Sequence, residues 1–155
     1  MAKYRILTKE ELVNFEKEFI DFLVVNGIVA EDWEKMKIEE EEKAEKIIDL
    51  FSDVVFEGVL RKIQFLELHT ETYVQAIQCL SDSMNMVVIS SKSKNFKISD
   101  FNPASPKSFI AENFELHSGT KPYSKDRELE LFEMTERGYQ ISDDQLFKSL
   151  IIATV

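Results

Sequence analysis

The spacing of the apolar residues changes near residue 62, and this change constrains the fold more than any other feature of the sequence. Before that point, apolar side chains recur every three or four positions, which places them on one face of an α-helix. From Ile63 onward they gather in short runs rich in β-branched and aromatic residues, which are typical of strands. The sequence therefore predicts an α+β fold, in which N-terminal helices and a C-terminal helix pair pack on a small antiparallel sheet of three or four strands.

The first helix is predicted over about residues 9–26. Thr8 and Glu11 have the spacing of a capping box, in which each side chain accepts a hydrogen bond from the backbone amide of the other. Apolar residues then recur at helical spacing as far as Asn26 and Gly27. This pair is typical of a helix end, because glycine adopts a left-handed conformation without strain.

Two further helices are expected before the change in spacing. Acidic residues that suit a first helical turn follow Ala30 and predict a short second helix. A third helix over about 40–61 is the clearest element of the sequence. Its apolar stripe consists of Ala44, Ile47, Ile48, Phe51, Val54, Val55, Gly58 and Val59. The sequence leaves open whether the second and third helices are continuous.

Three runs after the change predict strands that form a meander: Ile63–His69, Thr72–Leu80 and Met84–Ser90. Short polar breaks separate them, as expected for turns between neighbouring strands. A fourth, weaker strand is expected within Lys92–Ser99, where apolar residues alternate with lysines and polar residues.

A long irregular segment is predicted from Pro103 to Pro122, because proline interrupts both helices and sheets. A short helix near Phe109 is expected inside it. The helix predicted next, Ser124–Arg137, has acidic residues near its start and ends at Gly138. Alternating glutamate and leucine in this segment leave a strand open as the alternative.

A final helix is predicted from about residue 143, since Ser142 and Gln145 have the spacing of a second capping box. Apolar residues occupy more than one face of this helix. We therefore expect it to pack in the core or against another chain. This apolar surplus and an open strand edge together predict a homodimer, because two-fold dimers are the commonest soluble assembly.

The composition predicts a single domain over residues 1–155 that folds without a metal or a disulfide. Apolar residues make up 44% of the chain and charged residues 31%, as in ordinary globular proteins. The single cysteine, Cys79, cannot form an intrachain disulfide, and its apolar neighbours favour a buried side chain over a reactive thiol. No apolar run is long enough for a membrane span or an export signal, so we expect a soluble, cytoplasmic protein.

The net charge of −10 argues against nucleic acid as a partner, because a phosphate backbone is bound by a basic surface. The negative charge is concentrated in residues 1–61, which hold 16 acidic and 9 basic side chains. Residues 62–155 hold 13 acidic and 10 basic side chains. One stretch, residues 91–125, is locally basic, with six lysines against three acidic residues.

The best candidate for chemistry is Glu67, His69 and Glu71. Alternation along a strand would place these three side chains on one face, where two carboxylates and an imidazole could bind a divalent cation. No further metal-binding motif accompanies them, and a polar, solvated strand face is the favoured interpretation. His117, the other histidine, is interpreted as a loop residue.

Several classes of enzyme lack their usual motifs. No serine lies in a G-x-S-x-G turn, and Cys79 lacks basic neighbours that would activate a thiol. Neither a G-x-G-x-x-G sequence nor a P-loop is present, so we expect no nucleotide and no other cofactor.

The acidic run Glu39–Glu42 has two interpretations. It can form a recognition surface for a basic partner, or it can be the solvated start of a helix. The second is favoured, because charge runs most often lie on solvated faces.

Four segments of the chain resemble a small uncharacterised family of Bacteroidota proteins. These segments are Tyr4–Leu12, Phe22–Ile28 followed by Trp33, Leu50–Asp53, and Gly138–Asp143. The family carries a domain-of-unknown-function label. The resemblance implies a bacterial cytoplasmic protein and supplies no activity, cofactor or site residue.

The sequence therefore favours a non-catalytic protein-interaction or regulatory protein, whose partner is another protein or a second copy of the chain. The alternative is a metal-assisted, hydrolase-like enzyme that uses the Glu67, His69 and Glu71 face. Convergence of these three side chains in a concave pocket would favour the enzyme, and their exposure to open solvent would disfavour it.

Overall fold

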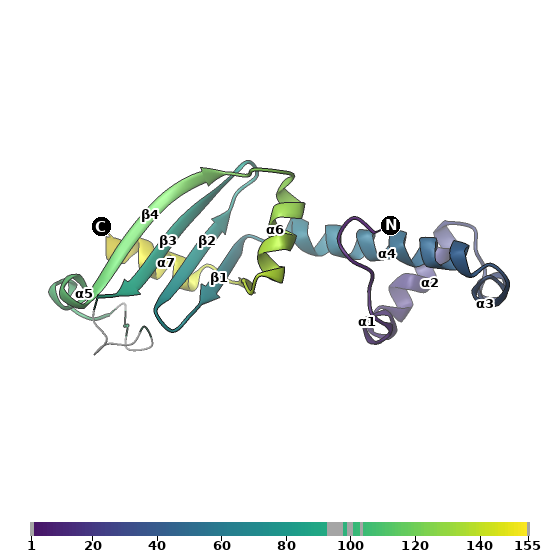
Figure 1. The fold of residues 1–155 in the computed structure, drawn as a ribbon, viewed down its shortest axis with the longest axis horizontal. Helices are drawn as coiled ribbons and strands as arrows, with labels where there is room; N and C mark the ends of the chain where they lie inside the picture. The colour runs from purple at the N-terminus through teal and green to yellow at the C-terminus, as the bar shows by residue number, and fades with distance from the viewer. Residues whose placement is uncertain (1, 93–97, 99–100, 103, 155) are drawn as a thin grey trace. The chain divides into compact units, whose positions relative to one another are not determined.

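The computed structural model describes residues 2–92, 98, 101–102 and 104–154. Within these residues the chain forms seven helices and one antiparallel sheet of five strands (Figure 1). The predicted α+β class is therefore confirmed. The chain divides into two compact units, Met1–Arg61 and Lys62–Val155, and the division falls where the apolar spacing changes. The single domain over residues 1–155 stays a prediction.

The first unit, called the helical unit below, contains four helices: α1 (Lys9–Asn14), α2 (Glu16–Val25), α3 (Ala30–Glu39) and α4 (Glu41–Lys62). The capping box is present, with Glu11 N–H donating to Thr8 Oγ1 at 3.2 Å and Thr8 N–H donating to Glu11 Oε1 at 3.0 Å. The predicted end of the first helix is also confirmed, because Gly27 has a φ of +75°.

The helical unit differs from the prediction in how its helices are divided. The first predicted helix is broken at Phe15, where φ is −106° and ψ is 22°. The second and third helices are separate, because Glu40 leaves the helical conformation with φ at −132° and ψ at 59°. Neither break carries a proline or a glycine, so the sequence offers no local signal for them.

Aromatic and aliphatic side chains from α2, α3 and α4 form the core of the helical unit. Trp33 packs edge-on against Phe19, with ring centroids 5.1 Å apart, and Phe19 also contacts Phe51 at 5.0 Å. Phe51 is 2% exposed, as expected from the stripe on α4. Val54 and Val59 are 57% and 43% exposed. They lie at the two margins of the stripe, because each helical residue turns by about 100°.

The N-terminal segment before α1 is bound along α4 by hydrogen bonds. The Asp53 carboxylate accepts from the backbone N–H of Lys3 at 2.8 Å and of Tyr4 at 3.3 Å. The Ser52 hydroxyl accepts from the Leu7 N–H at 2.9 Å and donates to the Ile48 carbonyl at 2.7 Å. These bonds satisfy backbone groups that regular structure leaves unpaired in this segment.

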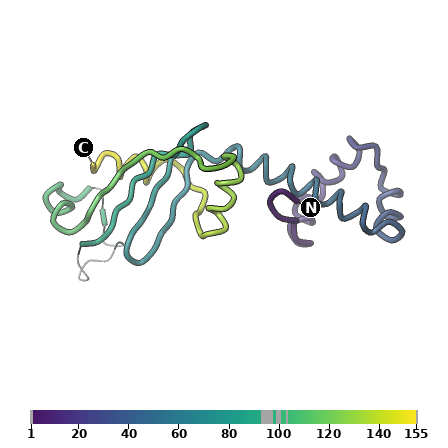
Figure 2. Tube along the Cα trace, turned by 45° about the horizontal axis from the view of Figure 1, so that its top comes forward, coloured from purple at the N-terminus to yellow at the C-terminus, as the bar shows by residue number. Residues whose placement is uncertain are grey.

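The second unit, called the sheet unit below, is built on strands in the order β4-β3-β2-β1-β5. Their bounds are β1 (Phe65–His69), β2 (Tyr73–Cys79), β3 (Ser83–Ser91), β4 (Phe114–Pro122) and β5 (Gln140–Ser142). The meander of the first three strands is confirmed. Figure 2 shows β3 and β4 running side by side over their whole length.

Two strands were not expected from the sequence. The segment predicted as irregular contains β4, whose nine residues all pair with β3. Its side chains from His117 onward are exposed, and so they carry no apolar pattern that would mark a strand. The other unexpected strand, β5, has three residues and pairs with β1. Most of the predicted strand within Lys92–Ser99 lies outside the described residues.

Three helices complete the sheet unit: α5 (Lys107–Asn113), α6 (Arg127–Glu136) and α7 (Gln145–Thr154). The short helix near Phe109 is confirmed. The helix expected over residues 124–137 is also confirmed as α6, and it ends before Gly138, whose φ is +103°. The alternative of a strand there is wrong.

Contrary to the prediction from the sequence, the last helix is not capped by Ser142. Ser142 belongs to β5, pairs with Phe65, and its buried hydroxyl has no hydrogen-bond partner within the described residues. The Asp143 carboxylate accepts from the Gln145 N–H at 3.0 Å instead. Ser142 is therefore part of a strand, although the local sequence pattern predicted it as the cap of a helix.

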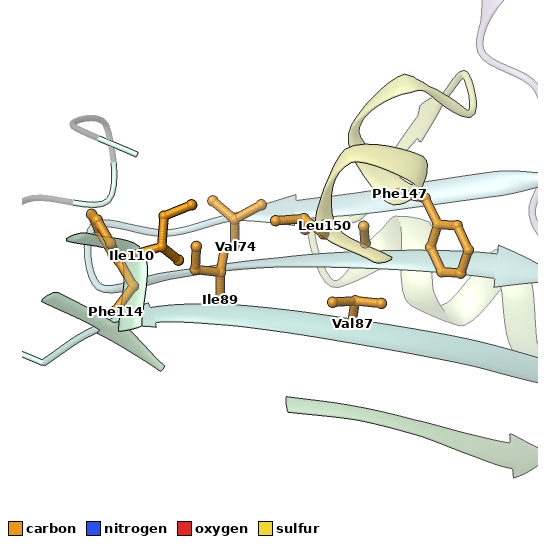
Figure 3. Packing of buried hydrophobic residues seen from close by; sticks show 8 residues of the cluster. Val74, Val87, Ile89, Ile110, Phe114, Phe147 and Leu150 are labelled. Carbon is orange, nitrogen blue, oxygen red and sulfur yellow. The ribbon is translucent and has the colours of Figure 1, made fainter. Parts of the chain in front are cut away.

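One face of the sheet is covered by α7 and α5. Figure 3 shows Leu150 of α7 near Val74 and Val87, with Phe147 at one end of the cluster and Ile110 of α5 at the other. The cluster is completed by Ala76, Ile89 and Phe114. This packing leaves Leu150 fully buried and Phe147 8% exposed. The apolar surplus of the last helix is thus largely buried within its own unit, which removes one of the two arguments for a dimer.

Candidate functional site

The structure brings together two of the three candidate residues, Glu67, His69 and Glu71. Glu67 and His69 both lie on the face of β1 that α7 covers, and His69 Nε2 is 2.8 Å from Glu67 Oε1. Glu71 lies beyond the end of β1, in the turn to β2, and is exposed. The expectation that alternation places all three on one strand face is therefore wrong for Glu71. The reason is that β1 ends at His69.

The pair of Glu67 and His69 lies at the solvent boundary. The His69 side chain is 53% exposed and that of Glu67 is 16% exposed. Among the described residues, no three His, Cys, Asp or Glu side chains have an arrangement that could hold a metal ion. The pair therefore forms a surface contact in which a charged histidine would be attracted to the carboxylate.

His117 lies on β4 rather than in a loop, opposite Val88 of β3. Val88 points away from the cluster that contains Val87 and Ile89, so His117 lies on the sheet face opposite to His69. Strands β2 and β3 also separate the two histidines. They therefore cannot act on one substrate or bind one ion.

Cys79 is buried, as predicted, and 6% exposed. Burial raises the pKa of its thiol to about 11, which outweighs the opposing effect of the nearby Arg127 guanidinium. At neutral pH the thiol is therefore protonated and a poor nucleophile.

Arg127, at the start of α6, is a residue that the sequence did not single out. Its guanidinium donates to the carbonyl of Ile63 at 2.6 Å and to that of Leu80 at 3.0 Å, and it pairs with Glu128 at 3.1 Å. The Tyr123 hydroxyl also donates to the Leu80 carbonyl, at 2.8 Å. These bonds join α6 to the ends of β1 and β2, which is a structural role.

A second polar contact lies on the face opposite α7. The Tyr139 hydroxyl donates to Gln75 Oε1 at 2.6 Å, and Gln75 is 9% exposed. Burial raises the pKa of Tyr139, and the neighbouring Tyr73 raises it further. Both partners are neutral at physiological pH. The contact can orient a bound group but supplies no base or nucleophile.

The described part of the helical unit contains an apolar groove between α2 and α3, with a volume of about 300 Å³. Phe19, Leu23 and Trp33 are among its lining residues, and they also belong to the core of the unit. The remaining lining residues are Glu16, Ile20, Val24, Ile28, Ala30, Glu34 and Lys37. The groove thus combines an apolar lining with charged side chains.

The acidic run Glu39–Glu42 lies at the junction of α3 and α4, and all four side chains are exposed. Glu41 and Glu42 occupy the first turn of α4, where negative charge interacts favourably with the helix dipole. This is the solvated helix start that the sequence favoured.

No helix in the described residues is long and apolar enough to cross a membrane. No curated protein and no solved structure matches the chain. Residues 1–154 match a family described as a family of unknown function, DUF6495. Because the match covers nearly the whole chain, this protein belongs to the DUF6495 family.

Proposed function

We propose that this chain is a non-catalytic bacterial protein of the cytoplasm that binds a protein partner in the groove between α2 and α3. The occupant is a basic, amphipathic helical segment of that partner. The observation that carries the proposal is an apolar helix surface left exposed beside an apolar groove in the acidic unit of the chain.

The exposed apolar surface belongs to α2. The structure describes all ten residues of this helix, and one of them, Leu23, is buried. Ile20, Val24 and Val25 are 50%, 63% and 85% exposed. Single exposed aliphatic side chains are ordinary, but a contiguous set beside a groove is typical of a protein-binding surface. Ile20 and Val24 are four residues apart, so they lie on the same side of α2 as the groove that they line.

The apolar lining of the groove, which comes from two neighbouring helices, suits a helical ligand. Helical ligands insert apolar side chains spaced three or four residues apart into hydrophobic grooves of this kind. A volume of about 300 Å³ lies at the lower end of the range for small-molecule pockets, and it accommodates a few such side chains.

The charge of the helical unit specifies the partner further. Glu16 and Glu34 line the groove together with Lys37, which pairs with Glu34 at 3.0 Å. Residues 1–61 as a whole hold seven more acidic than basic side chains. Complementary charge increases the rate of encounter and disfavours acidic competitors. A segment with an apolar stripe flanked by lysine or arginine therefore fits best.

The alternative of a metal-assisted enzyme has less support. The observation that favours an enzyme is the 2.8 Å contact between Glu67 and His69. The position of Glu71 beyond the end of β1 counts against it. Calorimetric titration with zinc and manganese tests this alternative. A micromolar site that disappears in His69→Ala would show that this face binds a metal and would favour the enzyme over the interaction function.

The proposal is tested by capture from the native cell with three baits. These are the unchanged chain, an Ile20→Glu/Val24→Glu variant, and an Ile38→Glu control. Ile38 is 83% exposed on α3 and does not line the groove. Circular dichroism checks that each bait is folded. We expect a partner that the first and third baits retain and the groove variant loses.

A synthetic peptide from the captured partner then completes the test. We expect it to be basic and amphipathic and to bind the isolated full-length chain in calorimetry, with binding lost in the groove variant. Capture that the groove variant retains would overturn the proposal, as would a bound segment that is acidic or lacks an apolar stripe.

A further inference from the structure

We propose that β4 pairs with β4 of a second copy of the chain, antiparallel and about a two-fold axis at Ser118. The pairing joins the two sheets into one sheet of ten strands. This inference is independent of the proposed function, because it uses the sheet unit alone.

The outer edge of β4 is long and regular. β4 is the first strand in the sheet order, and its nine residues pair with β3 without a bulge, from Ser83 opposite Pro122 to Ser91 opposite Phe114. No described strand pairs with its other edge, and His117–Pro122 is exposed throughout. The opposite edge of the sheet, β5, has three residues and offers a much shorter template.

The hydrogen-bonding pattern shows which residues of β4 direct their backbone groups outward. The Lys92 N–H donates to the Asn113 carbonyl at 2.9 Å, which makes these two residues a hydrogen-bonded pair just before β4. Such pairs alternate along an antiparallel ladder, so His117 and Gly119 bond toward β3. Leu116, Ser118 and Thr120 therefore direct their N–H and C=O groups away from β3.

A two-fold axis at Ser118 uses all of these outward groups. Ser118 meets the partner's Ser118, and Leu116 meets the partner's Thr120, each as a hydrogen-bonded pair. Ser118 is also the central residue of β4, so this register gives the full overlap of both strands. Pro122 has no N–H and ends the ladder on each side.

The side chains of β4 complement one another in this register. Glu115 comes to lie opposite the partner's Lys121, twice by symmetry, in pairs without backbone hydrogen bonds, where side chains approach most closely. Within one chain, Glu115 Oε2 is 3.7 Å from His117 Nε2, and Lys121 Nζ is 3.8 Å from Glu130 Oε1. The Glu115 and Lys121 side chains are 55% and 56% exposed, so both can reorient from these long contacts toward the partner. No other two-fold register places these two residues opposite each other. His117 comes to lie opposite the partner's Gly119, which leaves room for the imidazole ring.

The net charge of −10 opposes association of like chains, but this charge is unevenly distributed. Residues 91–125, which include β4, contain six lysines and three acidic residues. β4 itself holds one glutamate and one lysine, so the strand that forms the contact adds little to the repulsion between like chains.

Light scattering behind a sizing column, at tens of micromolar chain and physiological salt, tests the dimer. We expect twice the chain mass of 18.0 kDa for the unchanged protein and the monomer mass for Ser118→Pro. Proline removes an outward N–H and leaves the ladder with β3 intact. A monomeric unchanged chain, or a Ser118→Pro dimer, would overturn the proposal.

Charge reversal tests the register. Glu115→Lys and Lys121→Glu each convert two attractive pairs into two repulsive ones, so we expect each to raise the dimer dissociation constant roughly tenfold. The double variant restores both attractive pairs and should restore affinity. Lys125→Glu is the matched control, because Lys125 lies beyond β4 and pairs with Glu133. Single variants that leave the dissociation constant unchanged, or a double variant without rescue, would overturn the register.

Discussion

The two units of this protein bury their apolar residues to different extents. In the sheet unit, Leu66, Ala76, Ile77, Val87, Leu131 and Leu150 have no exposed surface. In the helical unit, the most buried apolar side chains, Phe51 and Leu60, are 2% exposed. Among the described residues, ten of the thirteen large apolar side chains with substantial exposure lie in the helical unit.

This difference follows from the architecture of each unit. A sheet with helices packed on its face buries alternate residues of every central strand at once. Three helices of six to ten residues can bury only part of a 22-residue helix such as α4. We infer that the sheet unit is the more stable part of the fold and that the helical unit leaves more apolar surface exposed.

The largest effect is expected from Phe51→Ala, which opens a cavity beneath Phe19 and Phe22 and costs about 3–5 kcal/mol of stability. Calorimetry measures this loss and also tests the predicted single domain. If residues 1–155 unfold as one domain, a single transition moves down in temperature. If the two units unfold separately, the variant lowers one transition and leaves the other in place. An unchanged unfolding profile would mean that Phe51 is not a core residue.

A comparable effect is expected in the sheet unit from Leu150→Ala, which removes a fully buried side chain over Val74 and Val87 and costs about 2–5 kcal/mol. Ile152→Ala is the control on the same helix, because Ile152 is 68% exposed and its replacement should change stability by less than about 0.5 kcal/mol. Chemical denaturation measures both. Equal losses in the two variants would contradict the assignment of the buried face of α7.

A smaller effect is expected from Thr8→Ala, which removes the acceptor for the Glu11 N–H and costs about 1 kcal/mol. The loss should appear in denaturant unfolding of the full chain. If the units unfold separately, it should be confined to the transition of the helical unit. No change in the midpoint would show that the cap of this six-residue helix contributes nothing to the unit.

The smallest effect concerns pH and Glu11. The hydrogen bond from Arg5 lowers the pKa of this carboxyl from 4.5 to about 2, with a further contribution from the Thr8 amide. Because the folded state has the lower pKa, the resulting stability is fully present above pH 4.5 and is lost as pH falls toward 2. The difference in stability between the unchanged chain and Glu11→Gln should therefore shrink over this range. A difference that stays constant between pH 6 and pH 2 would contradict the pairing with Arg5.

Much of the fold could be predicted because the relevant signals are local. The capping box at Thr8, the glycine ends at Gly27 and Gly138, and the three runs of the meander each depend on residues close in sequence. The candidate site was less predictable. Alternation placed Glu67 and His69 correctly, but the position of Glu71 depended on where β1 ends. No local sequence pattern indicated the role of Arg127, because it donates to carbonyl groups about fifty or more residues away in the sequence.

The sequence by itself determined the class of the fold, the positions of most helices and the burial of Cys79, since hydrophobic periodicity and capping act within a few residues. Only the tertiary structure decided that the polar segment Phe114–Pro122 is a strand and that Ser142 pairs in the sheet rather than capping a helix. An edge strand is stabilised mainly by backbone hydrogen bonds to its neighbour. Every residue except proline can form those bonds, so they leave no pattern in the side chains.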